Sequence, residues 1–99
     1  MAIGPQVFNT LSAARQSRLN LSAATVVKAS RGFVATVTVV TAGSTAGRVH
    51  DTLTTGAAAT ANCIAAVPNT VGTYIVNFPA QTGIVVVPGT GQTLAISFA

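Results

Sequence analysis

The second half of this sequence carries no charge. Residues 52–99 contain no Asp, Glu, Lys, Arg or His. About a quarter of the residues in an ordinary soluble domain are charged, and interspersed surface charge keeps isolated domains apart. A long neutral stretch therefore indicates that much of the surface is covered by further copies of the chain or by a larger assembly. This pattern predicts a structural, assembly-forming protein rather than an enzyme.

The composition supports one domain with a core of small side chains. The chain has 99 residues, of which 49% are hydrophobic, with one Tyr, four Phe and no Trp. A length of this order suits a single folded unit. Ala and Val dominate the apolar residues, and they bury less area per residue than Leu or Phe. We therefore expect oligomerisation to contribute to stability.

The few charged residues all lie in the first half of the chain. The net charge is +4, and Asp51 is the only acidic residue. Spread cations of this kind fit an acidic partner surface, whereas nucleic-acid binders usually carry a denser basic patch. Direct nucleic-acid contact is therefore not expected. The cations are Arg15, Arg18, Lys28, Arg31 and Arg48.

Hydrophobic periodicity indicates strands from residue 25 onward. Apolar and polar residues alternate with a period of two, β-branched residues dominate, and Gly, Pro and Asn separate the segments. About seven short strands at this spacing predict an all-β fold, an antiparallel β-sandwich or jelly-roll-like domain over residues 23–99. The expected strands are 25–30, 33–41, 48–54, 63–67, 72–78, 84–87 and 92–98.

The alternation also predicts which side chains face inward. In the second strand one face holds Phe33, Ala35, Val37 and Val39, and the other holds Val34, Thr36, Thr38 and Val40. Later strands are expected to turn Tyr74, Val76, Phe78, Leu94, Ile96 and Phe98 inward. Residues 84–87 are apolar without alternation, so both faces of that strand should be covered. We interpret this as contact with another subunit, through Ile84 and Val86.

Residues 1–22 differ from the rest and predict an N-terminal arm. A short helix over residues 11–18 and an extended arm that reaches a neighbour both fit this segment. Either form would place its apolar residues against another surface, and Arg15 and Arg18 would meet an acidic one. The candidate contact residues in the arm are Val7, Phe8, Leu11, Arg15 and Arg18.

The sequence offers little material for catalysis. We predict no catalytic, cofactor-binding or metal-binding residues, because the chain has one His, one acid and one Cys. His50 and Asp51 are neighbours on a strand and point to opposite faces. We expect His50 to pair with solvent or backbone, and Asp51 to be satisfied by backbone amides or by Arg48 or Arg31 of a neighbour. Cys63 is expected to be a small buried hydrophobe.

Four segments together carry a family resemblance. They are residues 20–28 (NLSAATVVK), 47–51 (GRVHD) with 55–58 (TGAA), 67–74 (VPNTVGTY) and 83–92 (GIVVVPGTGQ). In these the chain resembles small virion structural proteins of tailed bacteriophages, most closely capsid decoration (cement) proteins. The resemblance implies a β-rich subunit on the outer capsid surface. It also implies a homotrimer at capsomer junctions, bound to the major capsid protein and without catalytic residues.

Other functions remain open from the sequence. A phage tail or fibre module that binds a receptor or glycan would use exposed Tyr74 and Asn69. The repeated Thr-x-Thr pattern, at Thr36/Thr38 and Thr52/Thr54, fits a solvated strand face and, less directly, a sugar- or ice-binding face. Residues 1–5 lack a basic start and no apolar run reaches membrane-spanning length. We therefore expect synthesis in the host cytoplasm, assembly into a virion and no membrane partner.

Overall fold

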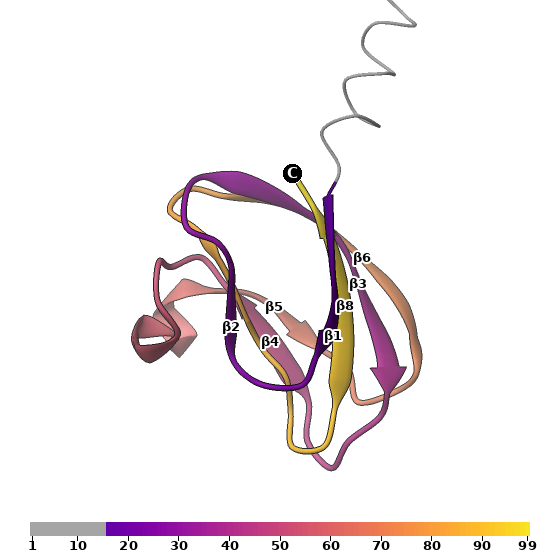
Figure 1. Cartoon of the computed structure of the whole chain (residues 1–99). Helices are drawn as coiled ribbons and strands as arrows, with labels where there is room; N and C mark the ends of the chain where they lie inside the picture. The colour runs from indigo at the N-terminus through magenta and orange to yellow at the C-terminus, as the bar shows by residue number, and fades with distance from the viewer. Residues whose placement is uncertain (1–15) are drawn as a thin grey trace, which may run out of the picture.

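The computed structural model describes residues 16–99, which form eight β-strands (Figure 1). The all-β prediction is confirmed, and the described residues contain no α-helix. Two short 3-10 turns, η1 (Thr55–Ala57) and η2 (Thr60–Asn62), lie between the fourth and fifth strands. The strands are β1 (Gln16–Leu21), β2 (Thr25–Lys28), β3 (Gly32–Thr41), β4 (Gly47–His50), β5 (Cys63–Val67), β6 (Gly72–Ala80), β7 (Ile84–Val87) and β8 (Thr93–Phe98). No helix in this part of the chain is long and apolar enough to cross a membrane.

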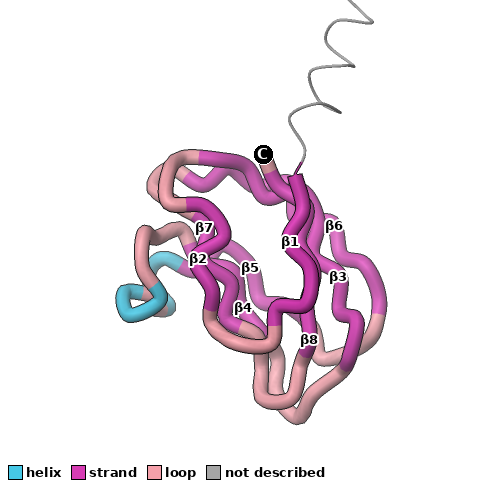
Figure 2. Tube along the Cα trace, in the orientation of Figure 1, coloured by secondary structure: helices cyan, strands magenta, loops and turns pink. Residues whose placement is uncertain are grey.

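The strands form two antiparallel sheets of four, in the orders β1-β8-β3-β6 and β2-β7-β4-β5. The pairing is nested: β1 pairs with β8, β2 with β7, β3 with β6 and β4 with β5. Figure 2 shows the two sheets facing each other, with the C-terminal end beside the start of β1. Strands that are neighbours in the sequence therefore alternate between the sheets along the first half of the chain.

One apolar core joins the two sheets. Its members come from seven of the eight strands, and most are fully buried Val, Ile or Leu, as expected where β-branched side chains pack on pleated surfaces. Tyr74 and Val76 pack against this core from β6, which confirms their predicted inward orientation. The buried cluster is Leu21, Val34, Val37, Val39, Val49, Val67, Ala80, Ile84, Val86, Leu94, Ile96 and Phe98.

The structure contains one strand more than the sequence predicted. The additional strand is β1, which lies within residues 1–22, the predicted arm, and pairs with β8. An irregularity between Arg18 and Leu21 includes Asn20 at φ 58°, a left-handed conformation that Asn tolerates. Because this irregularity interrupts the alternation of apolar and polar residues, the sequence pattern did not predict β1. The irregularity also brings Leu21 into the core. Residues 1–15, including most of the predicted arm, lie outside the described residues.

A β-bulge changes the predicted faces of β3. We expected Phe33 to share a face with Val37, and Val34 to share the other face, but Val34 is fully buried like Val37 and Phe33 is 36% exposed. The register shifts between Val34 and Thr36 against both neighbouring strands. The irregular residue places Val34 and Val37 on the same side. The prediction for Phe78 was also wrong, because its side chain is half exposed on edge strand β6.

Both faces of β7 are covered, as predicted, but the cover comes from the same chain. Ile84 and Val86 face the core, and Val85 on the opposite face is also fully buried. Val85 lies beside His50 of β4, and η1 packs against β7. The η1–η2 segment therefore buries the outer face of this strand. No second subunit is needed to explain its apolar run.

Close backbone approaches hold one end of the two sheets together. Gln92 is almost fully buried, its Oε1 accepts from the Gly89 N–H at 2.9 Å, and its Nε2 donates to the Pro68 carbonyl at 3.0 Å. A Cβ on Gly89 would overlap the backbone carbonyl oxygen of Thr45. Glycine at this position therefore lets the turn between β7 and β8 contact the connection between β3 and β4.

We predict that Gly89→Ala lowers the free energy of unfolding by about 2 kcal/mol, because the added methyl meets backbone that cannot rotate away. Gly56→Ala is the matched control, since a Cβ there meets nothing within 4 Å. That variant should be neutral or more stable by about 0.5 kcal/mol. Urea unfolding followed by circular dichroism measures both. Equal stability of the two variants would contradict this account of the turn.

Candidate interaction surfaces

The structure separates the predicted contact residues into three groups. Val7, Phe8, Leu11 and Arg15 lie outside the described residues. Arg18 is exposed on edge strand β1. Ile84 and Val86 have no exposed surface, because both belong to the core of the chain. Their side chains therefore offer nothing for a second subunit to contact.

An uncharged surface occupies the outer side of the β1-β8-β3-β6 sheet. One row across the four strands runs through Ser17, Ser97, Thr36 and Ile75, and a second includes Ala95, Thr38 and Thr73. Leu19 lines the same shallow groove of about 170 Å³. We call this surface the hydroxyl face: Ser17, Leu19, Thr36, Thr38, Thr73, Ile75, Ala95 and Ser97. None of its members is charged, and most are Ser, Thr or aliphatic.

The hydroxyl groups of this face bond to one another across strands. The Oγ1 of Thr36 lies 2.7 Å from the Oγ of Ser97, which also accepts from the Thr36 N–H at 3.2 Å. The Oγ1 of Thr38 lies 2.9 Å from that of Thr73. Polar groups that already have partners lose less when water is removed. The hydroxyl face can therefore be dehydrated at lower cost than its Thr and Ser content suggests.

Exposed aliphatic side chains stand on the two edge strands of this face. Leu19 of β1 is 71% exposed and Ile75 of β6 is 76% exposed. Between them lie the smaller side chains of β8 and β3. Arg18 is the nearest cation in sequence, but it pairs with Ile96, whose side chain points to the core side of the sheet. An uncharged surface with exposed aliphatic side chains and paired hydroxyls is compatible with a protein contact.

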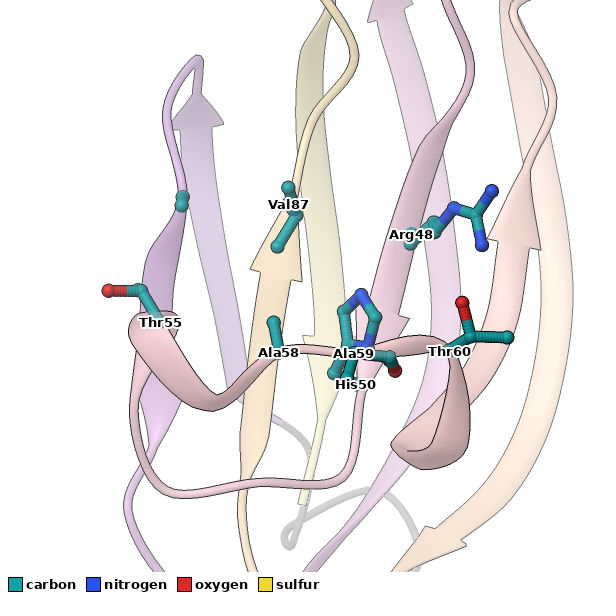
Figure 3. Close-up of a pocket in the computed structure, with 8 residues that line it drawn as sticks. Arg48, His50, Thr55, Ala58, Ala59, Thr60 and Val87 are labelled. Atoms are coloured by element: carbon teal, nitrogen blue, oxygen red, sulfur yellow. Dashed lines mark hydrogen bonds between the residues drawn. The ribbon is translucent and has the colours of Figure 1, made fainter.

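A second feature lies on the outer side of the other sheet, where the η1–η2 segment crosses β4 and β7 (Figure 3). An open pocket of about 360 Å³ forms there. His50 is only 4% exposed, and its Nδ1 lies 3.0 Å from the Ala59 carbonyl oxygen and 2.9 Å from the Asn62 Oδ1. Its predicted backbone partner is thus present. The lining residues are Ala24, Arg48, His50, Thr55, Ala58, Ala59, Thr60 and Val87.

Asp51 fixes the connection between β6 and β7. Its carboxylate accepts from the backbone N–H groups of Gln81 at 2.9 Å, Thr82 at 2.7 Å and Gly83 at 3.2 Å. The prediction that backbone amides satisfy this acid is confirmed. Desolvation raises the pKa of Asp51, but the three N–H groups together lower it by more, so its pKa lies below the ordinary value.

The remaining reactive side chains of the described residues lie apart from one another. Among residues 16–99 no three His, Cys, Asp or Glu side chains come together. Cys63 is partly exposed rather than buried as predicted, and its Sγ donates to the Ala65 carbonyl at 3.5 Å. It therefore serves as a small residue at the margin of β5.

The sequence indicated that these surfaces are uncharged and rich in hydroxyl groups, but it did not indicate which residues the fold brings together to form them. The hydroxyl face is formed by strand register, since its residues come from four strands that are distant in the chain. The Thr36/Thr38 spacing was the available signal, and it correctly indicated a solvated strand face. No sequence pattern indicated that His50 is buried under a loop of small residues.

No protein-family model, curated protein or solved structure matches this chain.

We predict that Asp51→Asn lowers the free energy of unfolding at neutral pH by about 1–2 kcal/mol, because an amide replaces a charged acceptor of three N–H groups at a partly solvated site. A carboxylate with a lowered pKa in the folded state stabilises the protein above its unfolded pKa. This contribution is lost as the pH falls through the folded value. The unfolding free energy of the unmodified chain should therefore decrease below about pH 5.

The difference between the two proteins isolates this side chain, because Asp51 is the only acidic residue in the sequence. Urea unfolding at a series of pH values should show the two stabilities converging in acid. Parallel curves down to low pH would contradict the role assigned to the three N–H contacts.

Proposed function

We propose that the protein is a bacteriophage virion structural protein, a capsid decoration (cement) subunit that acts by adhesion. The observation that supports it most is the hydroxyl face, an uncharged surface across four strands with paired hydroxyls and exposed Leu19 and Ile75. Such a surface suits permanent contact with protein more than contact with water. The resemblance of the four sequence segments to phage virion proteins points in the same direction.

The strand order supports the same proposal at the level of fold. We interpret the nested pairing of eight strands in two four-stranded sheets as a jelly roll. This connectivity is found in viral capsid and lectin domains, among others. A fold alone does not define a function. The argument therefore rests on the neutral surface, and the connectivity is consistent with it.

Such a subunit acts through the sum of many contacts, with neighbouring copies and with the capsid shell. In this proposal the hydroxyl face packs against a neighbouring copy in a homotrimer, and the N-terminal arm, with Val7, Phe8, Leu11, Arg15 and Arg18, binds the major capsid protein on the outer surface of the shell. Stable interfaces bury about 800 Å² on each partner. Repetition of one contact around a shell makes modest individual affinities strong collectively.

The alternative, a tail or fibre module that binds glycans, receives less support. Its two candidate residues use their polar groups within the chain. The Tyr74 hydroxyl donates to the Thr70 carbonyl at 2.7 Å. The Asn69 side chain accepts from the Gly43 N–H at 2.6 Å and donates to the Gly43 carbonyl oxygen. Groups that are engaged in this way are poorly placed to recognise sugar hydroxyls.

We predict that Ile75→Asp dissociates the oligomer, because it introduces an unpaired charge into a surface that must lose its water. Multi-angle light scattering measures the subunit number, and circular dichroism checks that the β-structure is retained. Leu53→Asp is the matched control, since Leu53 is 48% exposed in the segment after β4 and lies outside the hydroxyl face. An unmodified chain that is monomeric at high concentration would refute the proposed contact.

We predict that deletion of residues 2–15 abolishes binding to capsids while the β circular dichroism spectrum persists. The deletion leaves β1 intact, since that strand begins at Gln16. Co-sedimentation with capsids that lack this subunit measures the binding. If the shortened chain still bound all of its sites on the capsid, the arm would not be the segment that binds the major capsid protein.

A further inference from the structure

The pocket beneath the η1–η2 segment combines one cation with an oriented imidazole. Arg48 and His50 lie on the same face of β4, on either side of the buried Val49. In Figure 3 the Arg48 guanidinium and the Thr60 hydroxyl lie to the same side of the His50 ring, and Val87 lies on the other side. The rest of the lining is small, so the polar groups remain accessible.

The orientation of the His50 ring is fixed from one side. Both neighbours of its Nδ1 are oxygen atoms, so Nδ1 carries a proton and donates it. The Asn62 Oδ1 is itself held, because it accepts from the Ala59 N–H at 3.0 Å while Asn62 Nδ2 donates to the Ala57 carbonyl at 2.9 Å. None of the hydrogen bonds among residues 16–99 uses the His50 Nε2, and no buried polar side-chain atom there lacks a partner. Nε2 is therefore the ring atom that faces the open pocket.

The chain cannot supply a counter-ion for Arg48. Its only acidic side chain, Asp51, is turned to the opposite side and engaged by three backbone N–H groups. A second copy of the chain has the same shortage. An Asp or Glu side chain that binds in this pocket would therefore belong to a different protein.

We propose that this pocket binds an acidic side chain, Asp or Glu, of a partner protein. The Arg48 guanidinium and the Thr60 hydroxyl donate to the carboxylate, and His50 donates through Nε2. A guanidinium matches a carboxylate in charge and geometry. The assignment does not depend on the proposed virion role, since it follows from the charge and geometry of the pocket alone.

A donor at Nε2 requires the second ring proton of His50. In the neutral ring Nε2 bears a lone pair, which repels a carboxylate oxygen, so the bound state requires the proton on Nε2. Of the residues around the ring, Arg48 is the only charged one, and the others are neutral: Ala24, Thr55, Ala58, Ala59, Thr60, Asn62 and Val87. The bound ring therefore carries protons on both Nδ1 and Nε2.

A single carboxylate fits this pocket better than a nucleic-acid backbone. Phosphate chains are bound by several cations that follow their path. The other described cations belong to other elements, with Arg18 on β1, Lys28 at the end of β2 and Arg31 after it. The pocket offers the Arg48 guanidinium and the His50 ring at a single point, which suits one carboxylate rather than a chain of phosphates.

The test is a titration monitored by nuclear magnetic resonance of the His50 ring protons, which are unambiguous because the chain has one His. The probe is N-acetyl-glutamate N-methylamide, added to about 100 mM at constant ionic strength, a range that detects millimolar affinities. The neutral control probe is N-acetyl-glutamine N-methylamide. Arg48→Gln is compared with Arg18→Gln, which removes the same charge from an exposed position on the other sheet.

We expect a saturable shift with the glutamate probe and no saturable shift with the glutamine probe. Arg48→Gln should weaken the affinity by about fivefold or more, and Arg18→Gln should leave it unchanged within about twofold. An equal response to the glutamine probe, an undiminished response in Arg48→Gln, or no saturable shift would each overturn the proposal. Tighter binding of an oligothymidylate at the same ring would assign the pocket to phosphodiesters instead.

Discussion

Burial of short, branched side chains between two four-stranded sheets is the interaction on which the rest of this structure depends. The core consists mostly of Val with Ile, Leu and one Phe, and it draws from both sheets. Each such side chain contributes about 1.5–3 kcal/mol when it leaves water. Ion pairs cannot add to this sum, because the sequence contains a single acid. Packing and hydrogen bonds therefore have to position the connections between the strands and the side chains of the outer surfaces.

Polar side chains that bond to backbone hold the connections in place. Asp51 fixes the segment between β6 and β7, His50 and Asn62 fix the η1–η2 segment, and Gln92 fixes the turn before β8. Asn69 does the same for the connection between β3 and β4. In each case one side chain satisfies backbone groups that no strand pairs. These contacts leave the outer face of the β1-β8-β3-β6 sheet uncovered and hold the η1–η2 segment over the other sheet, where the second proposed binding surface forms.

The alternation of residues was sufficient to place seven strands within a few residues of their observed bounds, because pleated strands impose a period of two. It failed where that period is interrupted. The irregularity beside Asn20 concealed β1, and the bulge near Ala35 exchanged the faces of Phe33 and Val34. The run at residues 84–87 indicated burial on both sides correctly. Its cover lies in a segment of small residues whose path depends on side-chain contacts with His50 and Asn62, and no local pattern encodes such contacts.

The nested strand order also governs when the protein can fold during synthesis. Strand β8 lies between β1 and β3, so the first sheet has a gap at its centre until residue 98 has left the ribosome. Until then β1 has no partner, and the valine-rich strand β3 lacks one of its two neighbouring strands. Pairings between distant segments form slowly and leave strand edges open to other chains. A nascent chain of this kind depends on rapid completion or on a chaperone to avoid aggregation, and its neutral second half makes that period the most hazardous one.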